Sequence, residues 1–302
     1  MREEIISLPQ ATSLALARLK FPVVTAYQLG RLIFGLYRVR GIDGRRLEVP
    51  GPLPERRHFL EVRTFLMEHA VIQPVRGFPV GAVYTLLGGV DVSAHELLCT
   101  VDPFAYLSHL SAMALHGLTD RIPQMIFAAS PAPRQWRSFA DELMRKDLGE
   151  DLQSYVDARF PLLRRTKYEK ILGQPVHLAQ SSHLGAFKRL EPHGVRVSTL
   201  GRTSLDMLRD ADLCGGIQHV IETYEAHAAA YLQLIIAEVE QHGNDIDKVR
   251  AGYVLEERCG LSDPVFAHWR QHAKRGGSRK LVPNQPYSST YSEKWCLSLN
   301  VD

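Results

Sequence analysis

The spacing of apolar residues in the first ninety positions predicts three helices. Leucine and alanine recur with helical spacing over residues 8–19, and a second amphipathic run, AYQLGRLIFGLYR, follows Thr25 as a helix follows its N-cap residue. A stretch rich in Gly and Pro over residues 40–54 predicts a loop or arm, after which Pro54 opens a third helix over residues 54–68. The apolar stripe of this third helix contains Phe59, Val62 and Leu66.

Two short strands are predicted to follow the third helix. VIQPV and AVYTLL are rich in β-branched and aromatic residues, and the Gly/Pro-containing connection RGFPVG joins them as a hairpin. Three helices followed by a hairpin is the order of a winged helix-turn-helix, in which the third helix enters the DNA major groove and the hairpin touches the backbone. We therefore predict an α+β protein, with a winged helix-turn-helix DNA-binding domain over residues 1–92 and a larger mixed α/β domain over residues 93–302.

The core of the second domain is predicted to form around residues 102–128. Asp102 is placed to cap a helix, Pro103 occupies the first turn, and apolar residues then recur every three or four positions. Gly117 can adopt the left-handed conformation that ends such a helix. The β-prone run over residues 125–129 predicts a strand that returns against it.

The rest of the second domain is predicted to be mostly helical. WRSFADELMRKDLGEDLQSYVDARFP reads as a helix of mixed charge, and Ser198 or Thr199 can cap another that ends at the Gly-Gly pair 215–216. Residues 217–241 predict a long helix with a break near HAAAY, and residues 246–257 predict one more. The chain ends in a predicted strand, KWCLSLNV.

The positive charge of the chain is concentrated in its first part. The whole chain carries +3, whereas residues 20–80 hold ten Lys and Arg against five Asp and Glu and so carry +5. The fork of a guanidinium pairs with a guanine edge or with a phosphate. The candidate DNA-binding residues are base-reading Arg56, Arg57 and Arg63 and phosphate-contacting Arg45, Arg46 and Arg76. The alternative is a small winged domain used for protein contacts, whose arginines are merely solvated.

Residues with reactive or metal-binding side chains do not follow the spacing of a familiar active site. Four cysteines are scattered without a CxxC motif, and His109 and His116 share a helix face without an HExxH pattern. We interpret Asp206, Asp210 and Asp212, which crowd one helix end, as solvated charges. The sequence holds neither a Walker loop nor a GxGxxG motif. We therefore predict a protein that is not an enzyme, with no catalytic residue, no cofactor and no metal.

The N-terminal sequence predicts the compartment. MREEIISLPQ lacks the apolar centre of a signal peptide, and no apolar run approaches the length of a membrane span. We therefore expect a cytoplasmic protein that does not engage a membrane, with reduced thiols.

Five blocks of the sequence together carry a family resemblance. The winged-helix pattern of the N-terminal part is followed by YLSHLSAMALHGLTDRIP, VSTLGRTSLDMLRDADLCGGIQHVIETY, VRAGYVLEE and PYSSTYSEKWCLSLNV. In this order, and over most of residues 10–301, they resemble the AbiEi-type antitoxins of type IV toxin-antitoxin systems, which are also transcriptional regulators. The chain departs from the family pattern at Gly201, where the family has an acidic residue, and in the longer stretch over residues 40–54.

The resemblance implies two activities. The winged helix-turn-helix would repress its own operon by binding double-stranded operator DNA with inverted repeats, with residues 54–68 as the recognition helix and residues 76–79 as the wing tip. The C-terminal domain would neutralise a nucleotidyltransferase-type toxin encoded beside it, and no catalytic residue is carried over. Two rivals stay open: a standalone regulator whose C-terminal domain binds a protein or a ligand, and a nuclease joined to a DNA-binding module. The sequence leaves open the operator, the toxin, the mode of neutralisation and the oligomeric state.

Overall fold

The chain folds into two compact units, neither of which is contiguous in sequence. The computed structural model describes residues 5–19, 22–86, 92–180, 186–191, 194–274 and 279–301. Unit 1 comprises Met1–Phe104 and Pro131–Gln174, and unit 2 comprises Ala105–Ser130 and Pro175–Asp302. The predicted single boundary after residue 92 differs from the folded chain, which enters unit 2, returns to unit 1 and enters unit 2 again. The fold class is α+β.

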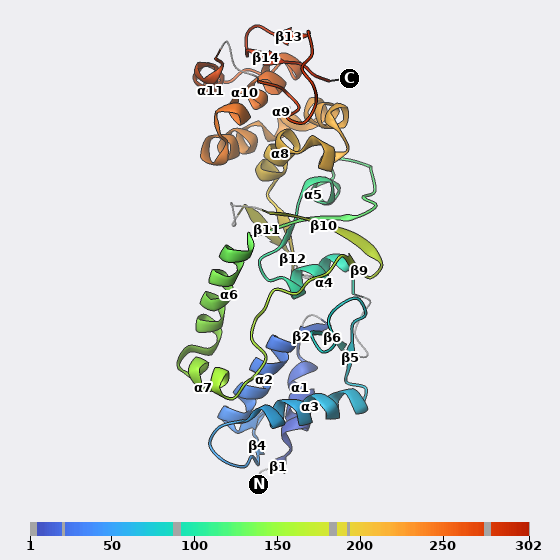
Figure 1. Cartoon of the computed structure of the whole chain (residues 1–302), viewed down its shortest axis with the longest axis vertical. Coiled ribbons are helices and arrows are strands. Elements are labelled where there is room, and N and C mark those ends of the chain that lie inside the picture. The colour runs from blue at the N-terminus through green and yellow to red at the C-terminus, as the bar shows by residue number, and fades with distance from the viewer. Residues whose placement is uncertain are drawn as a thin grey trace. The chain divides into compact units, whose positions relative to one another are not determined.

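Unit 1 consists of helices and two small three-stranded sheets (Figure 1). Its helices are α1 (Leu8–Leu16), α2 (Ala26–Val39), α3 (Arg56–Glu68), α4 (Ala94–Val101), α6 (Pro133–Leu148) and α7 (Leu152–Asp157), with a 3-10 turn at Gly149–Asp151. Its strands are β1 (Ile5–Ile6), β2 (Val23–Thr25), β3 (Gly41–Ile42), β4 (Arg45–Leu47), β5 (Ile72–Pro74), β6 (Val83–Leu86) and β9 (Lys170–Ile171). The sheets have the orders β1-β4-β3 and β2-β6-β5.

The three helices and two strands predicted for the first ninety residues are present. Ser7 and Thr25 cap α1 and α2, and in each case the Gln three residues later hydrogen-bonds back to the cap, as in a capping box. The third helix begins at Arg56, two residues later than predicted. Beyond it, β5 and β6 pair antiparallel as the expected hairpin, and β2 pairs with the other side of β6. Local spacing and caps therefore account for this part of unit 1.

The stretch over residues 40–54, predicted as a loop or arm, contains a second hairpin. β3 and β4 pair antiparallel, and β1 runs parallel to β4 on its other side. Asp43 and Gly44, between β3 and β4, have φ angles of 53° and 74°. A tight two-residue turn needs left-handed backbone at both positions, and Asp-Gly is a favoured pair for it. The prediction missed a turn signal that the sequence contains.

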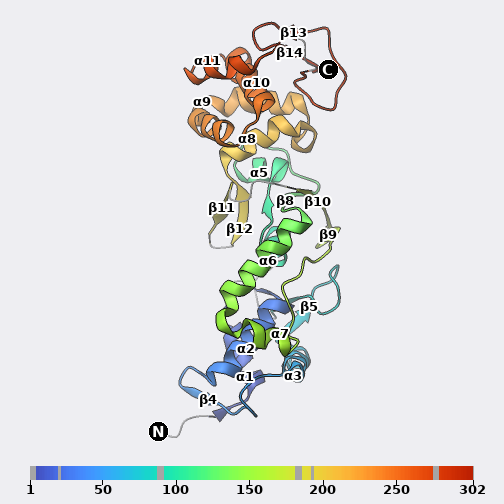
Figure 2. The ribbon, with the colours of Figure 1, turned by 60° about the vertical axis from the view of Figure 1, so that its left-hand side comes forward.

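Helices α6 and α7 complete the core of unit 1 although they lie a hundred residues along the chain. Trp136 and Tyr155 are almost wholly buried among the apolar residues of α1, α2 and α3. Trp136 Nε1 donates to the buried Asp102 carboxylate at 2.9 Å. Figures 1 and 2 both show α7 beside α2, where the Tyr155 ring packs against Tyr27 and Phe34.

Unit 2 has one mixed sheet, a helical layer and a C-terminal hairpin. Its strands are β7 (Tyr106–Leu107), β8 (Ile126–Ser130), β10 (Gln174–Gln180), β11 (Phe187–Leu190), β12 (Val195–Ser198), β13 (Tyr291–Ser292) and β14 (Leu297–Ser298). Its α-helices are α5 (His109–Leu115), α8 (Leu200–Arg209), α9 (Ile217–His242), α10 (Asp245–Tyr253) and α11 (Val265–Trp269). Shorter turns are the 3-10 segments Ala211–Cys214 and Arg270–His272 and the π turn Val254–Arg258.

The sheet of unit 2 supports α5, which in turn packs against α8 (Figures 1 and 2). Its strands lie in the order β11-β12-β7-β8-β10, and every residue of β8 is buried. β8 confirms the strand predicted for residues 125–129, but the helix predicted to start at Asp102 is wrong at its beginning. Asp102 ends α4, and the residues after it form β7 before Ser108 begins α5. Pairing with β8 and β12 on either side draws Tyr106 and Leu107 into the sheet.

The helical layer of unit 2 contains the three helices predicted after residue 198, with different ends, and also α11, which was not predicted. Thr199 caps α8, as predicted, through a hydrogen bond from the Arg202 N–H. The break predicted near HAAAY is absent, because α9 continues without interruption for 26 residues. Gly201 allows α8 and α9 to approach closely, since a Cβ there would stand 2.5 Å from the Leu234 carbonyl oxygen. The acidic residue of the family pattern has no room at this position.

Candidate nucleic-acid interface

The first two arginines of α3, Arg56 and Arg57, lie in different surroundings. Arg56 and Arg57 are both exposed at the start of the helix, while Phe59, Val62 and Leu66 face the core as predicted. Arg56 lines a groove of about 550 Å³ together with Arg159 and Arg164. Arg57 lines a separate groove of about 420 Å³ that also contains Glu48 and Glu61, and its Nε lies 3.3 Å from the Glu55 carboxylate. The Arg56 side of α3 is therefore basic, whereas the Arg57 side is of mixed charge.

Arg63 lies further along α3, half buried beside the β5-β6 hairpin. Its Nη1 and the Tyr84 hydroxyl are both within 3.5 Å of the point where a Cβ on Gly81 would stand. Burial raises the pKa of Tyr84, and the Arg63 guanidinium opposes that rise. This contact directs Arg63 toward its own hairpin, so a role in reading bases would require the side chain to leave Tyr84.

The connection between β5 and β6, which we call the wing segment, is the part of the hairpin predicted as a wing tip. Arg76 is exposed in it, and Val80 is fully exposed. Gly77 and Gly81 have φ angles of 89° and 78°, so the connection turns at two positions that favour glycine. The Phe78 ring packs edge-on against Tyr168, with 6.0 Å between the ring centroids, which anchors one side of the wing segment within unit 1.

Arg45 and Arg46 lie on β4 of the second hairpin. The Arg46 side chain is exposed, and Arg45 is half buried with a partner of its own. The structure thus places the six predicted DNA-binding arginines on three elements of unit 1: α3, the wing segment and the β3-β4 hairpin.

Two of the basic residues counted over residues 20–80 are paired with carboxylates from a later part of unit 1. Arg31 Nη1 lies 2.7 Å from the Asp147 carboxylate, and Arg38 Nε lies 3.1 Å from that of Asp151. The charge of +5 over residues 20–80 therefore overstates the free positive charge of these elements. The groove beside Arg56, by contrast, gains positive charge from outside this range. Arg159 and Arg164, which line it, lie in the part of the chain predicted to form the other domain.

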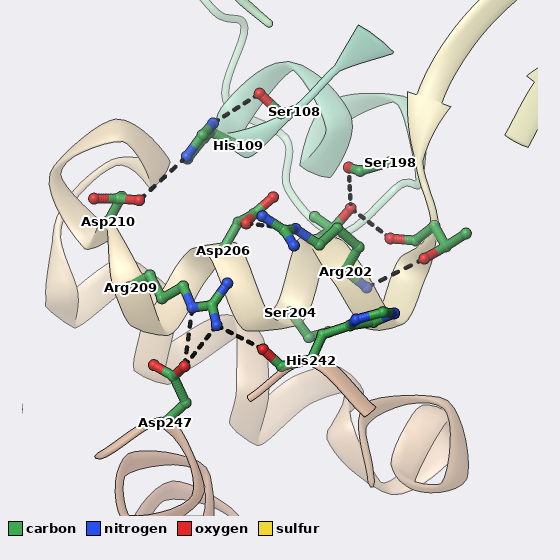
Figure 3. A network of polar contacts seen from close by, with 12 residues as sticks. Ser108, His109, Ser198, Arg202, Ser204, Asp206, Arg209, Asp210, His242 and Asp247 are labelled. Atoms are coloured by element: carbon green, nitrogen blue, oxygen red, sulfur yellow. Dashed lines mark hydrogen bonds and ion pairs between the residues drawn. The ribbon is translucent and has the colours of Figure 1, made fainter. Parts of the chain in front are cut away.

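A second polar cluster occupies the helical layer of unit 2 (Figure 3). Arg202 Nε donates to Asp206 Oδ1 at 2.8 Å, and both side chains are more than nine-tenths buried. Burial raises the pKa of Asp206, and the Arg202 charge opposes the rise. Arg209 makes a similar pair with the buried Asp247 carboxylate on α10. The prediction that Asp206 is a solvated helix charge is therefore wrong, because α8 is covered by α5 on one side and by α9 and α10 on others.

The same cluster places a serine, a histidine and an aspartate in a row. Ser108 Oγ lies 2.8 Å from His109 Nδ1, and His109 Nε2 lies 3.7 Å from Asp210 Oδ2. Interaction with the imidazole lowers the pKa of Asp210. His109 has φ 48° at the start of α5, and both Ser108 and His109 are buried. These three residues connect the start of α5 to the end of α8. Ser108 has no exposed surface, so its hydroxyl is not accessible to a substrate.

The described residues show neither a metal site nor a membrane-spanning helix. Within the ranges described above, no three His, Cys, Asp or Glu side chains converge to hold a metal ion. In the same ranges, no helix combines the length and apolar composition needed to cross a bilayer. The four cysteines are free thiols, and burial raises the pKa of Cys214 and Cys259.

Comparisons with known proteins show a similarity to a solved structure. No family model matches the chain, and no curated protein matches it. Among solved structures, the chain is similar to the RV2827C protein from Mycobacterium tuberculosis, with a TM-score of 0.45 and 15% sequence identity over 96% of this chain and 90% of that one. A likeness of this degree does not identify a family.

Proposed function

We propose that this protein is a DNA-binding autorepressor and antitoxin, and that its unit 1 contains a winged helix-turn-helix. The order α1, β2, α2, α3, β5, β6 supports the proposal, with the β3-β4 hairpin inserted before α3. The sheet order β2-β6-β5 joins the wing strands to the strand between the first two helices. In such a domain the third helix reads the major groove, and the hairpin touches the backbone.

The observation that carries the DNA-binding proposal is the basic side of α3. Arg56 is exposed at the N-terminal end of the helix, where base edges are reached, and it opens onto a groove that holds two more exposed arginines. The Arg57 side is balanced by nearby carboxylates. We therefore assign the operator-facing side of α3 to Arg56, with Arg46 and Arg76 as exposed candidates for phosphate contacts.

The antitoxin half of the proposal rests on the resemblance to the AbiEi-type antitoxins. The blocks that carry it fall on α5, α8, α9, α10 and the C-terminal hairpin. Their apolar residues form the core of unit 2, so the blocks define the fold of this unit. We propose that unit 2 neutralises a nucleotidyltransferase-type toxin in the cytoplasm and that the protein acts without a catalytic residue, cofactor or metal of its own.

A pocket in unit 2 favours a second candidate, a regulator that responds to a small polar ligand. The pocket has a volume of about 370 Å³, and polar groups of Asp212, Gln285 and Asn300 contribute to its wall. In this candidate, ligand binding to unit 2 would alter repression, and no toxin would be needed.

The first experiment is a gel shift on the DNA just upstream of the gene, compared with unrelated duplex over a range of salt concentrations. We expect preferential binding to the upstream DNA, with affinity that falls as salt rises because phosphate contacts release counterions. Arg56→Ala should weaken operator binding by about 1–3 kcal/mol and relax the preference at one base pair. Arg57→Ala is the matched variant and should cost less, since Glu55 already engages this side chain. A larger loss for Arg57→Ala would reverse the assignment of α3, and equal affinity for all duplexes would reject operator reading.

The antitoxin function has a separate test. Expression of the neighbouring nucleotidyltransferase gene should arrest growth, and co-expression of this protein should restore it. Full restoration by an Arg56→Ala variant with weakened operator binding would separate neutralisation from repression. If the unaltered protein fails to restore growth, the antitoxin half is rejected, and the ligand-responsive regulator becomes the better function.

A further inference from the structure

The segment that follows α7 lies along the start of α3 and widens its basic surface. Residues 159–164 follow the C-cap of α7, and five of them line the same groove as Arg56. Apolar groups of Val156, Phe160 and Leu162 form much of the groove, and Arg159 and Arg164 stand at its wall. These arginines lie about a hundred positions along the chain from α3, outside the helix-turn-helix and its wing.

We propose that Arg159 and Arg164 bind the sugar-phosphate backbone of the DNA that α3 reads, so that this segment is a second, non-wing contact to the duplex. The inference rests on the proposed DNA binding of unit 1 and deepens it by naming further residues of the interface. The segment would contact the DNA backbone and would not read bases, because its two guanidiniums lie beside the recognition helix and do not project from it.

The segment is held firmly enough to present these side chains in a fixed place. Phe160 is buried, with its ring centroid 5.9 Å from that of Phe59 on α3 and 5.4 Å from that of Phe34 on α2. The Tyr155 hydroxyl donates to the Pro161 carbonyl oxygen at 2.7 Å, which closes the turn after α7. Gly30 makes room for this turn, since a Cβ there would stand 2.6 Å from the Tyr155 hydroxyl oxygen.

The charges of the groove suit a polyanion. Arg56, Arg159 and Arg164 are all exposed. Among the residues that the structure describes, no hydrogen bond or ion pair engages their side chains, in contrast to Arg31, Arg38 and Arg57. Three unneutralised guanidiniums around one groove repel one another, and a phosphate backbone both relieves this repulsion and accepts their hydrogen bonds. The Arg57 groove, with its two glutamates, lacks this complementarity.

The test compares the salt dependence of DNA binding for the full-length protein and its variants. We expect the double variant Arg159→Ala/Arg164→Ala to bind operator and unrelated duplex more weakly by the same factor. Its slope of log affinity against log salt should be shallower by about 2, since each phosphate contact contributes about 0.9. The specificity ratio should stay that of the unaltered protein, whereas loss of a base-reading residue would lower it. Arg159→Lys/Arg164→Lys keeps both charges and should keep most of the slope.

The matched control removes two exposed arginines of unit 1 that do not line the groove. Arg134 and Arg137 are exposed on α6, and their replacement by Ala changes the net charge by the same amount. If the control pair and the groove pair change the slope equally, or if the groove pair changes nothing while the unaltered protein binds its operator, the inference is overturned and the proposed function stands. If the unaltered protein binds no duplex, both are overturned. Circular dichroism of each variant checks folding, and Gln replaces Ala where an alanine variant fails to fold.

Discussion

One guanidinium joins three helices of unit 2, and its removal tests how that unit is stabilised. Arg209 Nε and Nη2 donate to Asp247 Oδ2 at 3.0 and 2.7 Å, and Nη2 also donates to the His242 carbonyl oxygen at 2.8 Å (Figure 3). The Asp247 side chain is only 2% exposed, while that of Arg209 is 22% exposed. The contact links the end of α8 to the end of α9 and the start of α10.

We expect Arg209→Met to destabilise unit 2 by about 3 kcal/mol. Met keeps much of the apolar stem and removes the charge, so the buried Asp247 carboxylate keeps the Asn244 N–H, 3.0 Å away, but loses the guanidinium that pairs with it. Removal of one partner from a buried ion pair costs about 3–5 kcal/mol, and the partial exposure of Arg209 favours the lower end. With a urea dependence of about 1–3 kcal/mol per molar, the unfolding midpoint should fall by about 1–3 M.

The assay can be restricted to unit 2. The chain has three tryptophans, and a Trp136→Phe background leaves Trp269 and Trp295, both of which are buried in unit 2. Urea unfolding is followed by their fluorescence for the parent, Arg209→Met, Asp247→Asn and the double variant. The double variant leaves no unpaired buried charge, so it should be more stable than the two single losses predict.

A loss below about 1 kcal/mol for Arg209→Met would refute the reasoning, because that is the contribution of an exposed surface pair. Strict additivity of the two single losses would refute it as well, since the side chains would then act independently.

Two further predictions concern the stability of unit 2: the effect of Gly252→Ala, with Gly35→Ala in unit 1 as its control, and the pH dependence due to His116. Gly252→Ala would place a Cβ 2.0 Å from Cη2 of the buried Trp295, so overpacking should cost about 1–3 kcal/mol or more in chemical denaturation. Gly35→Ala, where a Cβ meets nothing within 4 Å, is the control, and an equal loss there would contradict the clash. Burial lowers the pKa of His116 from its usual 6.5, so the unfolded chain takes up the proton first and stability falls as pH drops below about 6.5. His116→Gln should lessen this acid-dependent loss in denaturation at pH 7.5 and 5.5, and an unchanged pH dependence would exclude His116 as its source.

The sequence predicted the local features of unit 1 well, because helix caps and apolar stripes act over a few residues. Thr25 and the stripe of α3 needed no distant partner to be recognised. The Asp43-Gly44 turn was equally local, and only its interpretation as a loop was wrong. The order of α1, α2, α3 and the β5-β6 hairpin could therefore be predicted from the sequence.

Features that depend on distant contacts could not be predicted in the same way. Asp102 has the residue type and the following proline of a helix start, but the indole of Trp136 binds its carboxylate and the neighbouring strands extend the chain after it. Asp206 has the position of a solvated helix charge, but α8 is enclosed by other helices and Arg202 pairs with it inside. Spacing along one helix carries no information about what covers each of its sides.

The sequence by itself determined where helices and strands form in the first ninety residues and which arginines are available there, because propensity, capping and periodicity are properties of neighbouring residues. Tertiary structure decided which of those arginines are paired with a carboxylate and which are left unpaired. Carboxylates from α6 and the turn after it neutralise Arg31 and Arg38, while the chain after α7 brings Arg159 and Arg164 beside Arg56. The electrostatic character of a surface depends on distances of a few ångströms, and only the folded chain sets those distances for residues a hundred positions apart.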